Sequence, residues 1–350
     1  MTIETAFPGG NVKVIGFQND TYFLEPDLRD TVGDWFYWAF KVSGAQGKTL
    51  TFKFNGNYVG YYGPAISYDL ENWHWQYSEK KESGNAFSYT FDENEVYFAH
   101  NYLYTPERFY KFALENNMQV QNLCVSEKNR PIPCLKLYNG ENHILLTARH
   151  HACESTGNYV LEGVLQELYK NPVPNTTVFC VPFVDYDGVI DGDQGKNRAP
   201  HDHYVDYAEN SSRYASVKKI QEYAKNNKVI LAFDFHSPWH CGGIHDGVFI
   251  VRNKANAASI HQFSSILQDQ TKNCALPYFS KNDMPADTDW NLESSPCFGH
   301  YMARIDTMLC AFSIESCYFG EEDHKFEIDS AVKLGRNFAL SVKRFLNEKK

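Results

Sequence analysis

The sequence lacks the long apolar run that a membrane-spanning helix needs. No stretch of its 350 residues approaches the ~20 consecutive apolar residues that cross a bilayer. Its beginning, MTIETAFPGG, also lacks the basic start and apolar core of a secretory signal. Positive charge is scarce too, since 33 Lys and Arg stand against 43 Asp and Glu, for a net charge of −10. This balance argues against nucleic acid or an anionic membrane as a partner, because both recruit clustered Lys and Arg.

Cysteine pairs of the CxxC kind are also missing, although the chain has nine cysteines. Their absence excludes the common structural zinc motif that is built from such pairs. The number is odd, and residues such as Cys180 and Cys310 lie in apolar runs, which is typical of buried thiols in a reducing compartment. We therefore expect a cytoplasmic protein. The sequence carries no signal for an oligomeric state.

The first part of the chain has the pattern of a β-domain. It holds short runs of β-branched and aromatic residues, such as 12–15, 35–42 and 49–54, which Gly, Asn and Asp separate. These runs predict strands, and several short strands in succession favour a sandwich. We therefore predict a small all-β sandwich domain over residues 1–103.

After Tyr104 the pattern changes to alternating strands and helices. Thr105 and Pro106 are typical of a helix cap and a first helical position. Continuous apolar runs then alternate with helical segments such as 216–226, for which Ser216 is the expected cap. This alternation predicts an α/β domain over residues 104–350, with a mixed, largely parallel sheet flanked by helices.

Residues suited to zinc chemistry stand where three predicted strands end. The strands at 143–147, 229–235 and 309–314 run into His151 and Glu154, into His236, and into Glu315 respectively. Sites in such sheets form beyond the carboxyl ends of the strands. Two imidazoles and one carboxylate leave a fourth position open on zinc, which is the catalytic arrangement. We therefore predict a Zn²⁺ site formed by His151, Glu154 and His236.

Four segments around these residues resemble the M14-type zinc carboxypeptidases, especially their cytosolic-carboxypeptidase-like branch. The segments are ARHHACESTG at 148–157, VPFVDYDGV at 181–189, FDFH at 233–236 and FSIES at 312–316. They occur in the family's order and cover most of residues 102–345. The resemblance implies a zinc carboxypeptidase-like catalytic domain after a leading β-domain. It also implies an enzyme that cleaves a peptide or amide bond.

The resemblance also implies roles for further residues. Glu315 matches the general base, which takes a proton from water and delivers it to the leaving amine. Arg198 matches the arginine that stabilises the oxyanion. Asp202 matches the carboxylate that accepts the far N–H of the first His ligand, here His151.

One departure from the family concerns substrate binding. Family members carry Asn-Arg two residues after this Asp, and that pair holds the terminal carboxylate of the substrate. Here the residues are Tyr204 and Val205, and neither makes the bidentate charged contact of an arginine. Candidate replacements are Arg213, Arg252 and Arg304. Alternatively, the substrate has no free carboxylate there, or its amide is not a peptide bond.

Three functions therefore stay open. The leading one is a metallocarboxypeptidase-type hydrolase acting on a peptide. The second is a zinc deacylase or amidohydrolase acting on a small N-acyl amino acid, which Tyr204 and Val205 permit. The third is a catalytically silent relative that binds peptide, against which the retained ligands, Glu315 and Arg198 argue. The loop histidines His201, His203, His240 and His245 are expected to lie in plain loops without binding metal.

Overall fold

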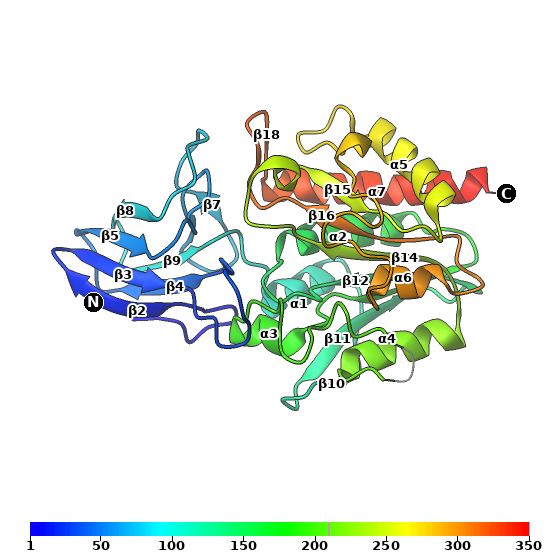
Figure 1. Cartoon of the computed structure of the whole chain (residues 1–350), viewed down its shortest axis with the longest axis horizontal. Helices are drawn as coiled ribbons and strands as arrows, with labels where there is room; N and C mark the ends of the chain where they lie inside the picture. The colour runs from blue at the N-terminus through cyan, green and yellow to red at the C-terminus, as the bar shows by residue number, and fades with distance from the viewer. Residues whose placement is uncertain (209–210, 350) are drawn as a thin grey trace.

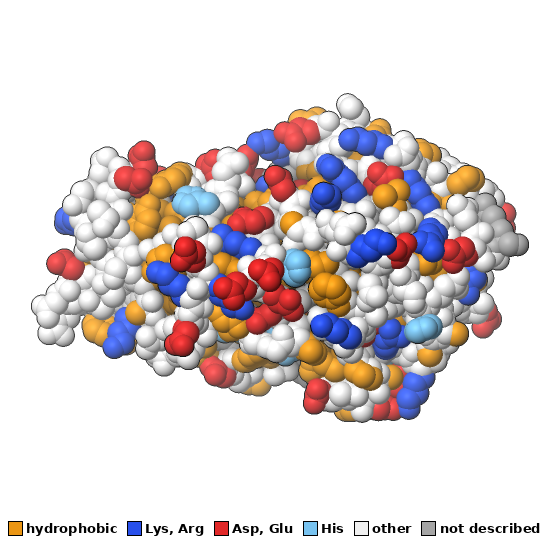
Figure 2. Space-filling view, turned by 90° about the horizontal axis from the view of Figure 1, so that it is seen from above, with side chains coloured by type: hydrophobic (Ala, Val, Ile, Leu, Met, Phe, Trp, Pro, Cys, Tyr) orange, Lys and Arg blue, Asp and Glu red, His pale blue; other side chains and the backbone are white. Residues whose placement is uncertain are grey.

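The computed structural model describes residues 1–208 and 211–349. An all-β part stands at the N-terminal end of the molecule, and a larger α/β part that includes the C-terminus lies beside it (Figure 1). This is the predicted fold class. On the face shown in Figure 2, acidic and basic side chains are interspersed, with hydrophobic patches between them. Within the described residues, no helix is both long and apolar enough to cross a membrane.

The N-terminal part contains a five-stranded sheet of order β1-β4-β9-β6-β7 and a four-stranded sheet of order β2-β3-β5-β8. The strands are β1 Thr2–Glu4, β2 Lys13–Gln18, β3 Thr21–Glu25, β4 Ala39–Ser43, β5 Thr49–Phe54, β6 Ala65–Ser67, β7 His74–Trp75, β8 Ala86–Thr90 and β9 Glu95–Ala99. Strand β5 shows why they form, because Leu50, Phe52 and Phe54 are buried while alternate residues are not. These side chains share a core with Trp38 and Phe98.

The α/β part is built on a seven-stranded sheet of order β10-β11-β13-β12-β14-β16-β15. Its strands are β10 Val120–Val125, β11 Pro131–Leu137, β12 Asn142–Ala148, β13 Thr176–Val181, β14 Lys228–His236, β15 Val248–Val251 and β16 Cys310–Ser316. The four central strands are parallel to one another, and the three outer ones are antiparallel to their neighbours. A small hairpin follows, formed by β17 Gly320–Glu321 and β18 His324–Lys325.

Helices cover both faces of this sheet. They are α1 Pro106–Glu115, α2 Thr156–Lys170, α3 Tyr186–Asp191, α4 Ala215–Asn226, α5 Ala257–Thr271, α6 Phe298–Ala303 and α7 Ile328–Glu348. Helices α2, α5 and α7 pack together on one face, and α4 and α6 lie on the other (Figure 1). As predicted, Thr105 caps α1 and Pro106 opens it.

Two local predictions are wrong. Of the run 35–42, only the part from Ala39 onward is in a sheet. The backbone of Tyr37 bonds instead to the side chain of Gln194, at 3.0 Å through its N–H and 2.7 Å through its carbonyl. Ser216 does not cap α4, because the cap position is Tyr214 and the Ser216 hydroxyl has no partner among the described residues.

The two parts of the chain meet at a buried pair of histidines. Nε2 of His100, after β9, lies 2.7 Å from Nδ1 of His240, in the segment after β14. The rings of Phe36 and Phe319 pack against the pair. Burial lowers the pKa of His240 to about 4 and also lowers the pKa of His100. Both rings are therefore neutral at pH 7.

This pair predicts loss of stability in acid. Between pH 6.5 and about 4, the unfolded chain binds a proton that folded His240 does not. The free energy of unfolding should fall as the pH falls through this window, by up to about 3 kcal/mol for His240. In urea unfolding curves, His240→Gln should flatten this pH dependence, whereas His261→Gln, at an exposed position, should not. Equal slopes in all three proteins would contradict the prediction.

Candidate active site

The carboxyl ends of β12, β14 and β16 border a cavity of about 530 Å³. The register of the sheet explains the placement, because His236 and Glu315 are opposite residues on neighbouring parallel strands. The lining residues used below are His151, Glu154, Lys196, Asp202, Tyr204, Val205, His236, His245 and Glu315, with the three tryptophans Trp35, Trp239 and Trp290. The cavity therefore lies beyond the carboxyl ends of the parallel strands, where sites in such sheets are expected.

A left-handed residue turns the chain at the end of β12. Arg149 has φ of 60°, and its buried guanidinium donates to the carbonyls of Ala152 and Tyr104. The bond to Ala152 closes the segment from Arg149 to Ala152 into a tight loop, and the bond to Tyr104 ties this loop to the segment before α1. The loop places His151 and Glu154, three residues apart, on the side of the cavity.

His151, Glu154 and His236 form a compact group of metal-binding atoms. One ligand atom from each lies within 4.8 Å of the others. Nδ1 of His151 lies 2.9 Å from Oε1 of Glu154, and Nδ1 of His236 lies 2.7 Å from its Oε2. Both imidazoles thus present the same nitrogen to the same carboxylate. The group fits a metal ion with two nitrogen ligands and one oxygen ligand.

A second carboxylate stands behind each imidazole. Nε2 of His151 lies 3.7 Å from a carboxylate oxygen of Asp202, and Nε2 of His236 bonds to Asp234. Such outer carboxylates fix the tautomer and the orientation of a ligating imidazole. The sequence did not lead us to predict this role for Asp234, although the residue stands two positions before His236 in the segment FDFH.

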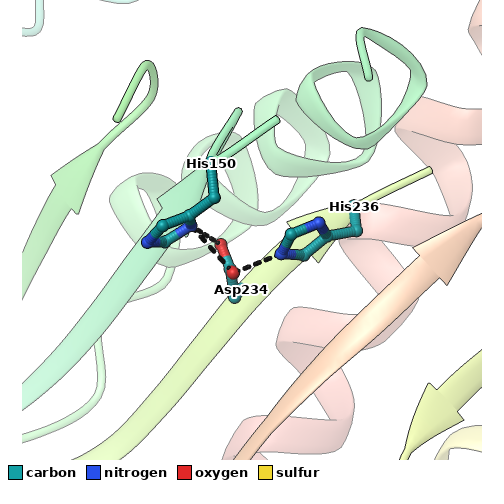
Figure 3. A group of neighbouring side chains, drawn as sticks. All are labelled: His150, Asp234 and His236. Carbon is teal, nitrogen blue, oxygen red and sulfur yellow. Dashed lines mark hydrogen bonds and ion pairs between the residues drawn. The ribbon is translucent and has the colours of Figure 1, made fainter. Parts of the chain in front are cut away.

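Asp234 also bonds to a third histidine, His150. Figure 3 shows its carboxylate between the imidazoles of His150 and His236. Nδ1 of His150 lies 2.9 Å from Asp234, and its Nε2 lies 2.7 Å from the hydroxyl of Tyr207. These three ligand atoms are also close enough for a metal. However, both nitrogens of His150 are already engaged, and the ring is fully buried away from the cavity lining. We therefore interpret this group as support for His236.

The charges of the site favour a bound cation. Burial alone would lower the pKa of His236, but the negative charges of Asp234 and Glu154 outweigh it and raise the pKa well above its ordinary value. His151 behaves in the same way beside Glu154 and Asp202. Burial opposes the charge on Glu154, yet its cationic neighbours hold its pKa well below the usual range. The same carboxylates that stabilise protons on these rings would stabilise a metal ion.

Glu315 faces the cavity without a hydrogen-bond partner for one oxygen. Its side chain is 6% exposed, and Oε2 has no partner among the described residues. Burial, together with the charge of Glu154, raises the pKa of Glu315 to about 7. A carboxyl group with a pKa near neutrality and a free oxygen is suited to accepting and returning a proton.

The structure does not bring Arg198 to this cavity. Its guanidinium lies 2.9 Å from Asp185, 3.1 Å from Asp30 and 3.2 Å from Asp193. Lys196, two residues earlier, lines the cavity instead, and its Nζ lies 2.5 Å from Oε1 of Glu154. The loop singled out in the sequence therefore does border the cavity, but through Lys196, whereas the role expected for Arg198 stays a prediction.

Contacts with the N-terminal part hold the loop that carries Lys196. The carboxylate of Asp30 accepts the backbone N–H groups of Gln194 and Gly195, at 3.1 and 2.9 Å. Thr31 bonds to the carbonyl of Lys196. Gly195 has φ of +76°, and a Cβ there would lie 2.2 Å from the backbone nitrogen of Ala152. Only glycine lets the loop lie this close to the segment of His151.

None of the three candidate arginines replaces the missing carboxylate anchor. Arg252 is paired with Asp283, and Arg304 lines a separate cavity. Arg213 is exposed and does not line the cavity. Among the described lining residues, Lys196 is the only Lys or Arg.

Two loop histidines also differ from expectation. His245 lines the cavity. His203 is buried and stacks on Tyr214 with ring centroids 3.6 Å apart.

Comparison with known proteins gives consistent matches to carboxypeptidases. Residues 3–101 match the family described as the cytosolic carboxypeptidase N-terminal domain. An uncharacterised protein of Zymomonas mobilis is 28% identical over 180 residues, which are 48% of this chain and 47% of that protein. Human cytosolic carboxypeptidase 2 is 24% identical over 297 residues, which are 67% of this chain and 32% of that protein. The matched stretches thus span half or less of these relatives.

The fold comparison covers the whole chain. The crystal structure of a metallo-carboxypeptidase from Burkholderia cenocepacia superposes with a TM-score of 0.81 at 16% identity, covering 100% of this chain and 99% of that one. The metallocarboxypeptidase fold predicted from the four segments is confirmed. The resemblance of the chain to the M14-type carboxypeptidases is confirmed by the family match over residues 3–101, by the match to human cytosolic carboxypeptidase 2 and by the shared fold.

Proposed function

We propose that this protein is a zinc-dependent hydrolase that cleaves a peptide or amide bond. The observation that carries the proposal is the group of His151, Glu154 and His236 beside a buried carboxylate, Glu315, with one free oxygen. When bound there, zinc supplies a Lewis acid for the carbonyl and lowers the pKa of water to ~7.

The residues of the chain divide the remaining work. Glu315 accepts the proton of the attacking water and delivers it to the leaving amine. Lys196 takes the role that the family resemblance implied for Arg198. It provides the positive charge next to the carbonyl oxygen of the substrate, which becomes negative during the reaction. Asp202 and Asp234 hold the imidazoles of the ligands in one tautomer.

The proposal extends to organisation and location. The division into domains at 1–103 and 104–350 is supported by the family match, which ends at residue 101. A cytoplasmic location is supported by nine unpaired cysteines and by the likeness to cytosolic carboxypeptidases.

Metal content and hydrolysis test this function together. The purified full chain should hold one zinc ion per molecule and should release amines from a library of peptides and N-acyl amino acids. The identity of the products separates a peptidase from a deacylase. If the zinc-loaded protein hydrolyses none of these substrates, the proposal is wrong and a binding role is favoured.

Replacing Lys196 should slow catalysis without weakening metal binding. In Lys196→Met we expect kcat to fall by roughly 10²–10³-fold, because an oxyanion donor is lost. Zinc affinity should not decrease, since the ammonium group 2.5 Å from Glu154 competes with a cation for that carboxylate. Kinetics and a competitive chelator titration measure the two effects. An unchanged kcat, or lost zinc, would exclude this role.

Asp30 should matter to catalysis although it lies in the N-terminal part. Asp30→Ala removes the acceptor of two backbone N–H groups in the loop of Lys196, so it should cost about 1–3 kcal/mol of stability. We also expect lower kcat/KM, because Lys196 is no longer held in place. Asp34→Ala, an exposed residue of the same segment, is the control for both urea unfolding and kinetics. Equal kcat/KM in the two variants would contradict the prediction.

A further inference from the structure

Aromatic rings form much of the cavity wall. Trp35, from the N-terminal part, and Trp239, from the segment after β14, pack with ring centroids 5.3 Å apart and ring planes tilted by 59°. Trp290 and Tyr204 also line the cavity. Trp239 and Trp290 are 41% and 47% exposed, respectively. Large exposed rings that line a cavity are suited to packing against an apolar or aromatic group.

In the part of the chain that the structure describes, the cavity has no cationic side chain that is left to pair with a carboxylate of the substrate. Three lining residues are acids, and the one Lys or Arg among the described lining residues is Lys196, which the proposed function assigns to the carbonyl oxygen of the bond that is cleaved. Burial, together with the charge of Lys196, lowers the pKa of His245, so this ring is neutral at pH 7. A free carboxylate beside that bond would find no second Lys or Arg among the described lining residues.

The backbone at Tyr204 and Val205 cannot substitute for the missing cation. The N–H groups of both residues point to the carboxylate of Asp202, at 3.1 and 3.4 Å. The remaining groups at these positions are a phenol and an isopropyl group. They suit a neutral, apolar end of a substrate.

We propose that the substrate carries no free carboxylate beside the bond that is cleaved and presents an aromatic or apolar group to Trp35, Trp239 and Trp290. An amide-blocked aromatic residue has this chemistry. An ionised carboxylate would lose its water without gaining a cation, whereas a carboxamide loses much less. This inference rests on the proposed hydrolase function.

A matched pair of substrates tests the inference. N-benzoyl-Gly-Phe-amide and N-benzoyl-Gly-Phe differ only in the carboxamide, and each is scored for cleavage of its Gly–Phe bond by the zinc-loaded full chain. We expect kcat/KM for the amide to exceed that for the acid by about 10- to 100-fold. An acid cleaved as fast as the amide, or faster, overturns the inference.

Binding separates this inference from the proposed function. N-acetyl-Phe-amide and N-acetyl-Phe are titrated against the zinc-loaded Glu315→Gln protein, and tryptophan fluorescence gives the two affinities. Tighter binding of the amide supports the inference even if neither benzoyl substrate is hydrolysed, a result that would overturn only the hydrolase function. Equal binding, or tighter binding of the acid, overturns the inference.

The aromatic wall has a test of its own. Trp239→Ala should weaken binding of N-acetyl-Phe-amide by about tenfold, because one face of the ring pair is lost. Binding of N-acetyl-Ala-amide should change little. Tyr110→Ala removes a ring of the same exposure, 41%, from α1 and should alter neither affinity. If folded Trp239→Ala binds the aromatic amide as tightly as the unchanged protein does, the tryptophans do not bind the aromatic group of the substrate, and this part of the inference is wrong.

Discussion

Glu315→Gln should abolish nearly all hydrolysis while the protein keeps its metal. The change replaces the free carboxylate oxygen with a group that cannot accept a proton, so kcat should fall by roughly 10²–10⁴-fold. Zinc content should stay at one ion per molecule, because Glu315 is not in the group of His151, Glu154 and His236. Steady-state kinetics and metal analysis of the same preparation measure both.

Stability distinguishes this loss from damage to the fold. Burial raises the pKa of Glu315 to about 7, so at pH 8 the folded chain holds a carboxylate charge that its surroundings disfavour. The neutral amide removes that charge, and the free energy of unfolding at pH 8 should be no lower than that of the wild type. A variant that unfolds more easily, or one that retains more than a tenth of the activity, would contradict the role of Glu315.

The grouping of His151, Glu154, His236 and Glu315 around one cavity could be predicted because a parallel sheet aligns the carboxyl ends of its strands. The apolar runs that end at His236 and Glu315 become neighbouring strands, and the register places these two residues opposite each other. His151 and Glu154 follow a third strand of the same sheet. In each case local sequence determines the strand, and strand geometry then brings the residues together.

Which cationic side chain lines the cavity could not be predicted in this way. Lys196 and Arg198 lie two residues apart in one loop, and no periodic pattern says which of them faces the cavity. The choice is made by Asp30, 168 residues earlier in the chain, which binds Arg198 and the backbone of the loop. Trp35 reaches the cavity for a similar reason, since its position depends on how the N-terminal part packs against the rest.

Removal of the metal should abolish activity and leave the fold intact. After treatment with a chelator we expect no measurable hydrolysis, full recovery with one equivalent of Zn²⁺, and no recovery with Mg²⁺, which prefers oxygen ligands. The far-ultraviolet circular dichroism should not change. The reason is that Glu154 keeps Lys196 as a partner at 2.5 Å and both imidazoles keep their carboxylates, so no buried charge is left alone. Metal should therefore add stability only through mass action, about 4 kcal/mol at a thousandfold excess over Kd, seen as a higher Tm.

Two histidine variants make this test specific to the site. His236→Asn removes one ligand and should reproduce the chelated state, with low zinc content and no hydrolysis. His143→Asn changes another buried histidine at the opposite end of the sheet, where its partner is the hydroxyl of Tyr223, and should keep both zinc and activity. Because the two residues sit at the carboxyl and amino ends of neighbouring parallel strands, only a site at the carboxyl ends predicts this difference. Equal zinc loss in both variants, or full activity after chelation, would place the metal elsewhere.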